Sequence, residues 1–118
     1  MGEIKDLLTK LEQFRDERDW GQFHDPKNLA LALSIEAAEL NELFLWKKES
    51  DLSSVDQDKL KDEIADVFAY AIMLAGQYGF DVSEIVRAKI LKNAQKYPIE
   101  IAKGNAAKYN ELEEAEGK

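Results

Sequence analysis

The chain has 118 residues, a length that predicts a single domain with a hydrophobic core of its own. Its 24 acidic and 16 basic residues give a net charge of −8, which argues against nucleic-acid binding through a broad basic surface. There is no cysteine and only one histidine, so disulfides, thiolate metal sites and multi-histidine zinc sites are excluded.

The first two predicted helices cover roughly the first 48 residues. Glycine (6) and proline (2) are scarce, which favours an all-α fold. Apolar residues at helical spacing predict a helix from about residue 3 to residue 19, ended by Gly21. Asp25 is the predicted N-cap of the second helix, with Pro26 as its first residue, and this helix is expected to continue to about Lys48.

Two further helices are predicted between residues 53 and 97. A serine at position 53 or 54 can cap the third, which is expected to run to about Tyr78, with Gly79 as a left-handed stop. Asp81 can cap the fourth, which should end near Tyr97 because Pro98 follows.

These elements predict a four-helix bundle in one domain, residues 1–112, with a polar tail at 113–118 that frays after about residue 112. The run LALALSIEAA in the second helix is apolar nearly all round, so a second subunit is expected to cover part of it, giving a dimer or tetramer. We find neither a signal pattern nor an apolar run long enough to span a bilayer, so the expectation is a cytoplasmic protein without membrane association.

Two carboxylate pairs stand out on the most apolar helices. Glu36 and Glu39 are three residues apart on the second helix, and Glu63 and Asp66 are three apart on the third. That spacing places each pair within about 60° on one helical face, so four carboxylates converge if the helices are neighbours. Unit charges 4 Å apart repel by about 4 kcal/mol at an effective dielectric of 20, so the cluster needs cations. All-oxygen ligands suit Mg²⁺ above all, with Mn²⁺ or Ca²⁺ less specific, whereas a di-iron site would need Glu-x-x-His motifs.

Residues around the acids suggest a site for a metal-bound nucleotide. Trp46 and Tyr70 each follow a pair member by seven residues and so should share its stripe. Lys89, Asn93 and Lys96 form a row that could hold phosphate oxygens. Each feature also has a plainer interpretation: acid pairs are often solvated, aromatics are often core, and lysines are often exposed. His24 is expected to be structural, and Glu42 is either exposed or paired with a neighbouring lysine.

The acid pairs occur together with other motifs. E-x-x-E followed by E-x-x-D, combined with RDW-x-QFH-x-P-x-NL, resembles the MazG-like group of all-α nucleoside triphosphate pyrophosphohydrolases. The likeness is greatest to the dCTP pyrophosphatase branch and extends through DEIADVFAY, KNAQKYP and KGNAAKY. It implies a homo-oligomeric four-helix bundle with active sites near subunit contacts, which hydrolyses a (deoxy)nucleoside triphosphate to the monophosphate and pyrophosphate.

The resemblance also assigns roles to residues. It implies that the four acids are the catalytic Mg²⁺ ligands, that two tryptophans line the base and sugar pocket, and that other residues contact the substrate or its phosphates. These positions are Glu36, Glu39, Glu63 and Asp66 for the metal, Trp20 and Trp46 for the pocket, and Tyr70, Asn93, Lys89, Lys96 and Tyr97 for substrate and phosphates. Leu11 departs from the branch, whose mammalian-type members have a histidine there, and this departure argues against strict cytosine selectivity and permits a broader or different base preference.

The leading hypothesis is therefore a Mg²⁺-dependent pyrophosphohydrolase that cleans the nucleotide pool, acting on dCTP or a modified dCTP, with Glu36 or Glu39 as the acceptor of the water proton. One alternative is a non-catalytic helical oligomerisation or regulatory module whose acids pair with a partner's cations. Another is a related pyrophosphatase for dUTP or another phosphoanhydride such as phosphoribosyl-ATP.

Overall fold

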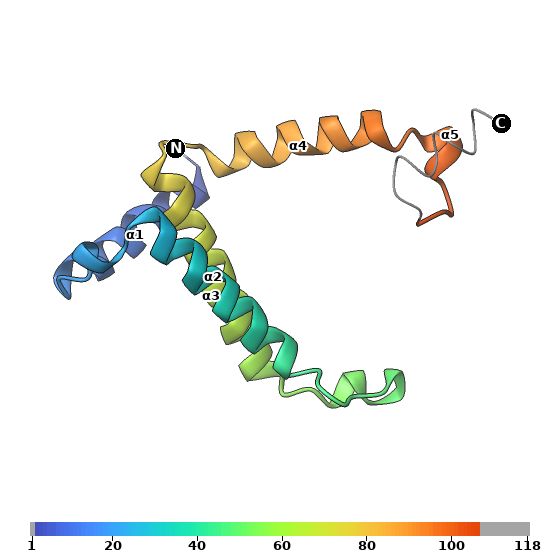
Figure 1. The fold of residues 1–118 in the computed structure, drawn as a ribbon, viewed down its shortest axis with the longest axis horizontal. Helices are drawn as coiled ribbons and strands as arrows, with labels where there is room; N and C mark the ends of the chain where they lie inside the picture. The colour runs from blue at the N-terminus through green and yellow to red at the C-terminus, as the bar shows by residue number, and fades with distance from the viewer. Residues whose placement is uncertain (1, 107–118) are drawn as a thin grey trace. The chain divides into compact units, whose positions relative to one another are not determined.

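A computed structural model describes residues 2–106, and every element in that range is helical. The predicted all-α class is confirmed. The elements in chain order are α1 (Glu3–Glu17), η1 (Gly21–Phe23), α2 (Pro26–Glu42), η2 (Glu49–Ser54), α3 (Gln57–Gln77), α4 (Val82–Lys96) and α5 (Ile99–Ala102), as labelled in Figure 1. The chain divides into two compact units, the first ending at Val82 and the second beginning at Ser83.

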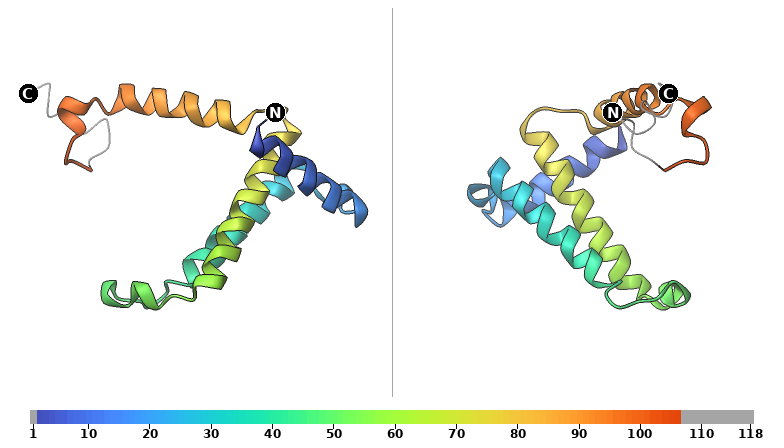
Figure 2. Two further views of the ribbon diagram at one scale, coloured as in Figure 1. Left: turned by 180° about the vertical axis from the view of Figure 1, so that it is seen from behind. Right: turned by 45° about the vertical axis from the view of Figure 1, so that its right-hand side comes forward.

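The first unit is organised around an antiparallel pair formed by α2 and α3, which lie side by side (Figure 1). This arrangement confirms the assumption that the two acid-bearing helices are neighbours. α1 packs across α3, as Figure 2 shows from two further directions. The side-chain amide of Gln77, the last residue of α3, donates a hydrogen bond to the backbone carbonyl of His24 and so ties the segment before α2 to the end of α3.

Aspartate side chains cap the N-termini of α2 and α3. The Asp25 carboxylate accepts a hydrogen bond from the backbone N–H of Asn28 at 2.7 Å, and Pro26 is the first residue of α2, as predicted. The predicted cap of the third helix was wrong. Residues 53 and 54 belong to η2, and the carboxylate of Asp56 caps α3 by accepting from the backbone N–H of Asp58 and Lys59.

The stop at the end of α3 is confirmed and follows a known hydrogen-bond pattern. Gly79 has φ of 71°, the Phe80 N–H donates to the Ala75 carbonyl at 3.0 Å, and the Gly79 N–H donates to the Gly76 carbonyl at 3.1 Å. These two bonds form a Schellman motif, in which the left-handed residue is usually glycine because it has no Cβ.

Two helices end earlier than predicted. α1 stops at Glu17, before Gly21, because Asp19 itself adopts the left-handed conformation with φ of 55°. α2 stops at Glu42 instead of continuing to Lys48, and a turn follows in which Trp46 has φ of 63°. The earlier end of α2 means that Trp46 is not on the same helix as Glu39.

The most buried side chains come from the facing parts of α2 and α3 and from the loop that joins these two helices. They are Leu29, Val55, Ile72, Met73 and Ala75. On the other faces of the α2–α3 pair, Leu31, Ile35 and Phe68 are more than half exposed. This exposed apolar surface agrees with the expected oligomer, which itself stays a prediction.

The second unit contains α4 from its second residue onward and the short helix α5. α4 begins directly after the predicted cap residue Asp81. The backbone N–H of Tyr97 donates to the Asn93 carbonyl at 2.8 Å, and Pro98 then separates the two helices. No helix in the described range 2–106 is long and apolar enough to cross a membrane. The predicted tail, 113–118, lies outside the described residues, as does the fraying expected after residue 112.

Candidate active site

Three of the four predicted metal ligands form one group between α2 and α3. Glu36 and Glu39 come from α2 and Glu63 from α3, and each contributes a carboxylate oxygen such that all three oxygens lie within 4.8 Å of one another. Glu36 and Glu63 are half-buried, and Glu39 is exposed. We call these three residues the acid cluster.

Burial and mutual repulsion make the acid cluster costly to ionise. The pKa of Glu36 is raised to about 7, first by burial and then by neighbouring carboxylates, chiefly that of Glu39. The pKa of Glu63 is also raised, again by burial first and then by the charge of Glu39. Within residues 2–106, no lysine or arginine forms a salt bridge with any of the three. Among the described residues, the negative charge of the acid cluster is therefore not offset by a paired cation.

The donor set fits a hard divalent cation. One oxygen of Glu36 and one of Glu63, Oε2 in both, are buried and accept no hydrogen bond from the described part of the chain. Buried acceptors without partners are rare in folded proteins, and a bound ion is one of the standard explanations. Mg²⁺ binds oxygens at about 2.1 Å, so its ligand atoms lie up to about 4 Å apart, a little less than the 4.8 Å within which the three oxygens of the acid cluster lie.

Asp66 lies on the same face of α3 as Glu63, one turn further along, and is not part of the three-oxygen group. It is close enough to influence the site, because its charge contributes to raising the pKa of Glu36 and of Tyr70. It also lines the cavity described next. Glu42 is the last residue of α2, is exposed, and lies outside the acid cluster.

A cavity of about 240 Å³ opens beside Asp66, between α1, α3 and the segment around η1. Its walls are mainly apolar and aromatic. The lining residues are Leu11, Phe14, Arg15, Trp20, His24, Asp66, Ala69, Tyr70 and Met73. The rings of Phe14 and Trp20 pack edge to face, with centroids 5.8 Å apart, and those of His24 and Tyr70 do so at 6.4 Å. Three of the nine lining residues, Trp20, Asp66 and Tyr70, were predicted site residues.

Polar groups in the cavity wall are few and partly unpaired. Tyr70 is half-buried, and its pKa is raised by burial and then by the charges of Glu36 and Asp66. The Nδ1 atom of His24 is buried and has no hydrogen-bond partner among the described residues. His24 was expected to be structural; its carbonyl does hold Gln77, but its ring faces Tyr70 in the cavity wall.

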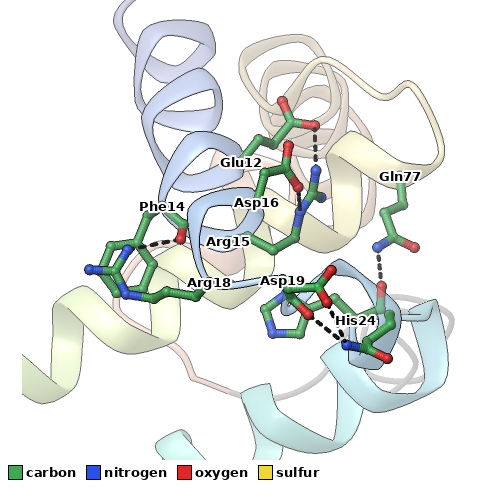
Figure 3. Close-up of polar contacts among 9 residues, drawn as sticks. Glu12, Phe14, Arg15, Asp16, Arg18, Asp19, His24 and Gln77 are labelled. Atoms are coloured by element: carbon green, nitrogen blue, oxygen red, sulfur yellow. Dashed lines mark hydrogen bonds and ion pairs between the residues drawn. The ribbon is translucent and has the colours of Figure 1, made fainter.

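Charged residues at the end of α1 are drawn in Figure 3. Arg15 donates from Nε to the Asp16 carboxylate at 2.8 Å, and its Nη2 lies 3.9 Å from a Glu12 carboxylate oxygen. The bond to Asp16 is the main reason that the pKa of Arg15 is raised. Arg18 lies over the ring of Phe14, 3.6 Å from its centroid, and also donates to the Phe14 carbonyl.

The remaining predicted residues lie elsewhere. Trp46 is 90% exposed and follows the end of α2, so the prediction that it shares a helical stripe with Glu39 was wrong. Lys89, Asn93 and Lys96 share a row on α4, at the predicted spacing, and Tyr97 follows that helix; all four belong to the second unit. Their part in substrate binding stays a prediction.

The sequence had assigned no site role to four residues of the cavity wall: Phe14, Arg15, Ala69 and Met73. The available signal was the spacing of Leu11, Phe14 and Arg15, at intervals of three and four, which places all three on one face of α1.

Comparison with known proteins places these features in a family context. Residues 31–112, which include both acid pairs, match the MazG-like family. The chain is 37% identical over 114 residues to dCTP pyrophosphatase 1 of Mus musculus and, equally, of Homo sapiens, covering 92% of this chain and 67% of each relative. A solved structure of a pyrophosphatase from Archaeoglobus fulgidus superposes with a TM-score of 0.76 at 39% identity, covering 83% of this chain and 94% of that one. The resemblance seen in the sequence is confirmed.

Proposed function

The chain belongs to the MazG-like family, and from this premise we propose that it is a Mg²⁺-dependent nucleoside triphosphate pyrophosphohydrolase. Its products would be a nucleoside monophosphate and pyrophosphate, with dCTP or a modified dCTP as the expected substrate. The names of its relatives support the reaction class. The observation that carries the proposal is an aromatic cavity lined by Asp66 and Tyr70, both of which interact electrostatically with Glu36 of the acid cluster.

The cavity accommodates part of a nucleotide. Sites for whole drug-sized ligands are usually about 300–1,000 Å³, so a cavity of about 240 Å³ suits a base with some of its sugar. Trp20 and Phe14 offer aromatic surface for a base, and stacking on such side chains is tolerant of base identity. The triphosphate would then extend past Asp66 towards the acid cluster.

Glu36, Glu39 and Glu63 would hold the metal ion, with Asp66 adding a fourth carboxylate, and Mn²⁺ could substitute for Mg²⁺. A bound divalent cation supplies charge neutralisation for a triphosphate and acidifies a coordinated water. Glu36 or Glu39 would accept the proton of the attacking water. The water oxygen would bond to the α-phosphorus while the α–β anhydride bond breaks and pyrophosphate leaves.

Further residues are proposed to contact the substrate. Tyr70 lines the cavity and faces the acids, where its hydroxyl could donate to a phosphate or sugar oxygen. In the second unit, the row of Lys89, Asn93 and Lys96, together with Tyr97, would serve the phosphates. Trp46 would close over the base or sugar from its exposed turn. A homo-oligomer would provide cover for the exposed apolar faces of α2 and α3.

The direct test incubates the protein with each of the common dNTPs and Mg²⁺ and measures pyrophosphate release. We expect turnover that is abolished by EDTA and by Glu39→Gln or Asp66→Asn, while the helical circular-dichroism signal is retained. Glu42→Gln is the matched control, because Glu42 lies on the same helix outside the acid cluster. No release from any nucleotide would overturn the proposal, and full activity in Glu39→Gln would overturn the metal assignment.

A further inference from the structure

Arg15 is a charged residue in an otherwise largely apolar cavity wall. It lies on α1 four residues after Leu11, on the same helical face, and both line the cavity together with Trp20. Its side chain is only 19% exposed. A guanidinium on a side chain covered to this extent is partly desolvated, and a partly desolvated charge favours hydrogen-bond partners. Its contacts therefore indicate what it can still bind.

The guanidinium is anchored but not saturated. Nε donates to Asp16 at 2.8 Å, and Nη2 lies 3.9 Å from Glu12, too far for a normal hydrogen bond. Nη1 has no partner among the described residues. Arginine has five N–H donors and no acceptor. At least three donors on the two terminal nitrogens are thus available while Asp16 restrains the plane of the group, as drawn in Figure 3.

The other polar residues of the wall have different capacities. Asp66 is acceptor-only when ionised, and its charge acts on Glu36 of the acid cluster. His24 and Tyr70 pack against each other edge to face. Leu11, Met73 and Ala69 cannot hydrogen-bond through their side chains. Among the nine lining residues, Arg15 is therefore the strongest donor that a base in the cavity could meet.

We propose that Arg15 determines base specificity by donating hydrogen bonds to a carbonyl oxygen of the nucleobase, so that the enzyme prefers carbonyl-bearing bases (cytosine, thymine, uracil and guanine) over adenine. This inference rests on the proposed function, because it assumes that the base occupies the cavity. Adenine has no carbonyl oxygen, so it offers Arg15 only ring nitrogens as acceptors, beside an amino group that is itself a donor. Sites built to hydrogen-bond a substrate group discriminate strongly against analogues that lack it, since the site's own polar group is then left unpaired.

A purely structural role is the competing explanation. Arg15 lies in the last turn of α1, where a cation stabilises the helix dipole, and it packs beside Gly21, where an added Cβ would lie 3.6 Å from Nε. Loss of that role would lower stability and would affect all nucleotides alike. The ratio of activities between bases distinguishes the two roles.

The test compares Arg15→Met with Lys10→Met, using dCTP, dTTP, dGTP and dATP. Methionine keeps an apolar stem of similar length and removes every donor, and Lys10 is an exposed cation on α1 that does not line the cavity. For the wild type we expect kcat/KM to be at least ~10-fold higher for dCTP than for dATP, and Arg15→Met should reduce this ratio by about 10-fold. Lys10→Met should leave the ratio unchanged.

Two results would overturn the proposal: a wild type that turns over dATP as well as dCTP, or an Arg15→Met variant that keeps the wild-type ratio, whatever its melting temperature. Dissociation constants for non-hydrolysable dCTP and dATP analogues are measured in parallel. If no nucleotide is hydrolysed, the proposed function fails. The binding ratio then decides the role of Arg15: a preference for the dCTP analogue that Arg15→Met removes supports it, and equal binding refutes it.

Discussion

Replacing Glu36 by glutamine should stabilise the metal-free protein while removing its activity. Within residues 2–106 no cation forms a salt bridge with Glu36. A carboxylate oxygen of Glu36 lies within 4.8 Å of one from Glu39 and one from Glu63. At that separation two unit charges repel by about 3 kcal/mol at an effective dielectric of 20 and by just under ~1 kcal/mol in bulk water. Because Glu39 is exposed, we take the lower figure for each of the two neighbours. The expected gain is about 1–2 kcal/mol, or roughly 4–8 °C in melting temperature for a domain of this size.

The pH dependence follows from the raised pKa of Glu36. Its pKa moves from an ordinary value of 4.5 to about 7 in the folded chain, so folding favours the protonated form. The metal-free wild type must then lose stability as pH rises through this range. Glutamine resembles the protonated acid and escapes that loss. The advantage of Glu36→Gln should therefore be greatest near ~pH 8 and small near ~pH 5.

The assay is thermal unfolding followed by circular dichroism, in EDTA and in millimolar Mg²⁺. In Mg²⁺ the order should reverse, because a cation that binds only the folded wild type stabilises it. Glu42→Gln, which removes an exposed charge from the same helix, should change neither profile. If Glu36→Gln melts no higher than the wild type in EDTA near ~pH 8, the account of the acid cluster as a repulsive group is refuted.

Three further predictions concern local structure. Asp25→Ala removes the acceptor of the Asn28 N–H and should cost about 1 kcal/mol in urea unfolding, with an unchanged midpoint contradicting the cap assignment. Gly76→Ala should cost about 1–3 kcal/mol because the new Cβ would lie 2.8 Å from a Leu8 methyl carbon, and Leu8→Ala in the same chain should recover part of the loss. Trp46→Gly should leave stability equal or slightly higher, because it relieves a positive φ, but should raise KM; an unchanged KM would exclude Trp46 from binding.

The parts of the site that could be predicted depend on local regularity. Three-residue spacing within a helix places Glu36 with Glu39 on one face whatever the rest of the chain does. The single long-range assumption needed was that α2 and α3 are neighbours, and their packing bears it out. The start of α2 was equally predictable, because Asp25-Pro26 is a strong local signal.

The errors arose where an element ends without a distinctive residue or where two elements cross. Nothing in the run LFLWKK after Glu42 marks a helix stop, since no glycine or proline is present and the left-handed position is taken by Trp46. The cavity was not predictable for a different reason. It depends on the angle at which α1 crosses α3, and that angle brings Phe14 and Arg15 to the same place as Tyr70 through contacts distant in sequence.

Leu8 and Gly76 lie outside the cavity, but their close approach sets the distance between α1 and α3 and therefore the width of the cavity. The two helices touch there because a glycine leaves room for the leucine methyls, and the cavity opens further along the same pair, between Leu11 and Met73. α1 is thus held against α3 at this contact, and the cavity is the space between the two helices beyond it. We expect a bulkier residue at position 76 to push the two helices apart and widen the cavity. Under the proposed function, affinity for a base would then change through a residue that does not line the cavity.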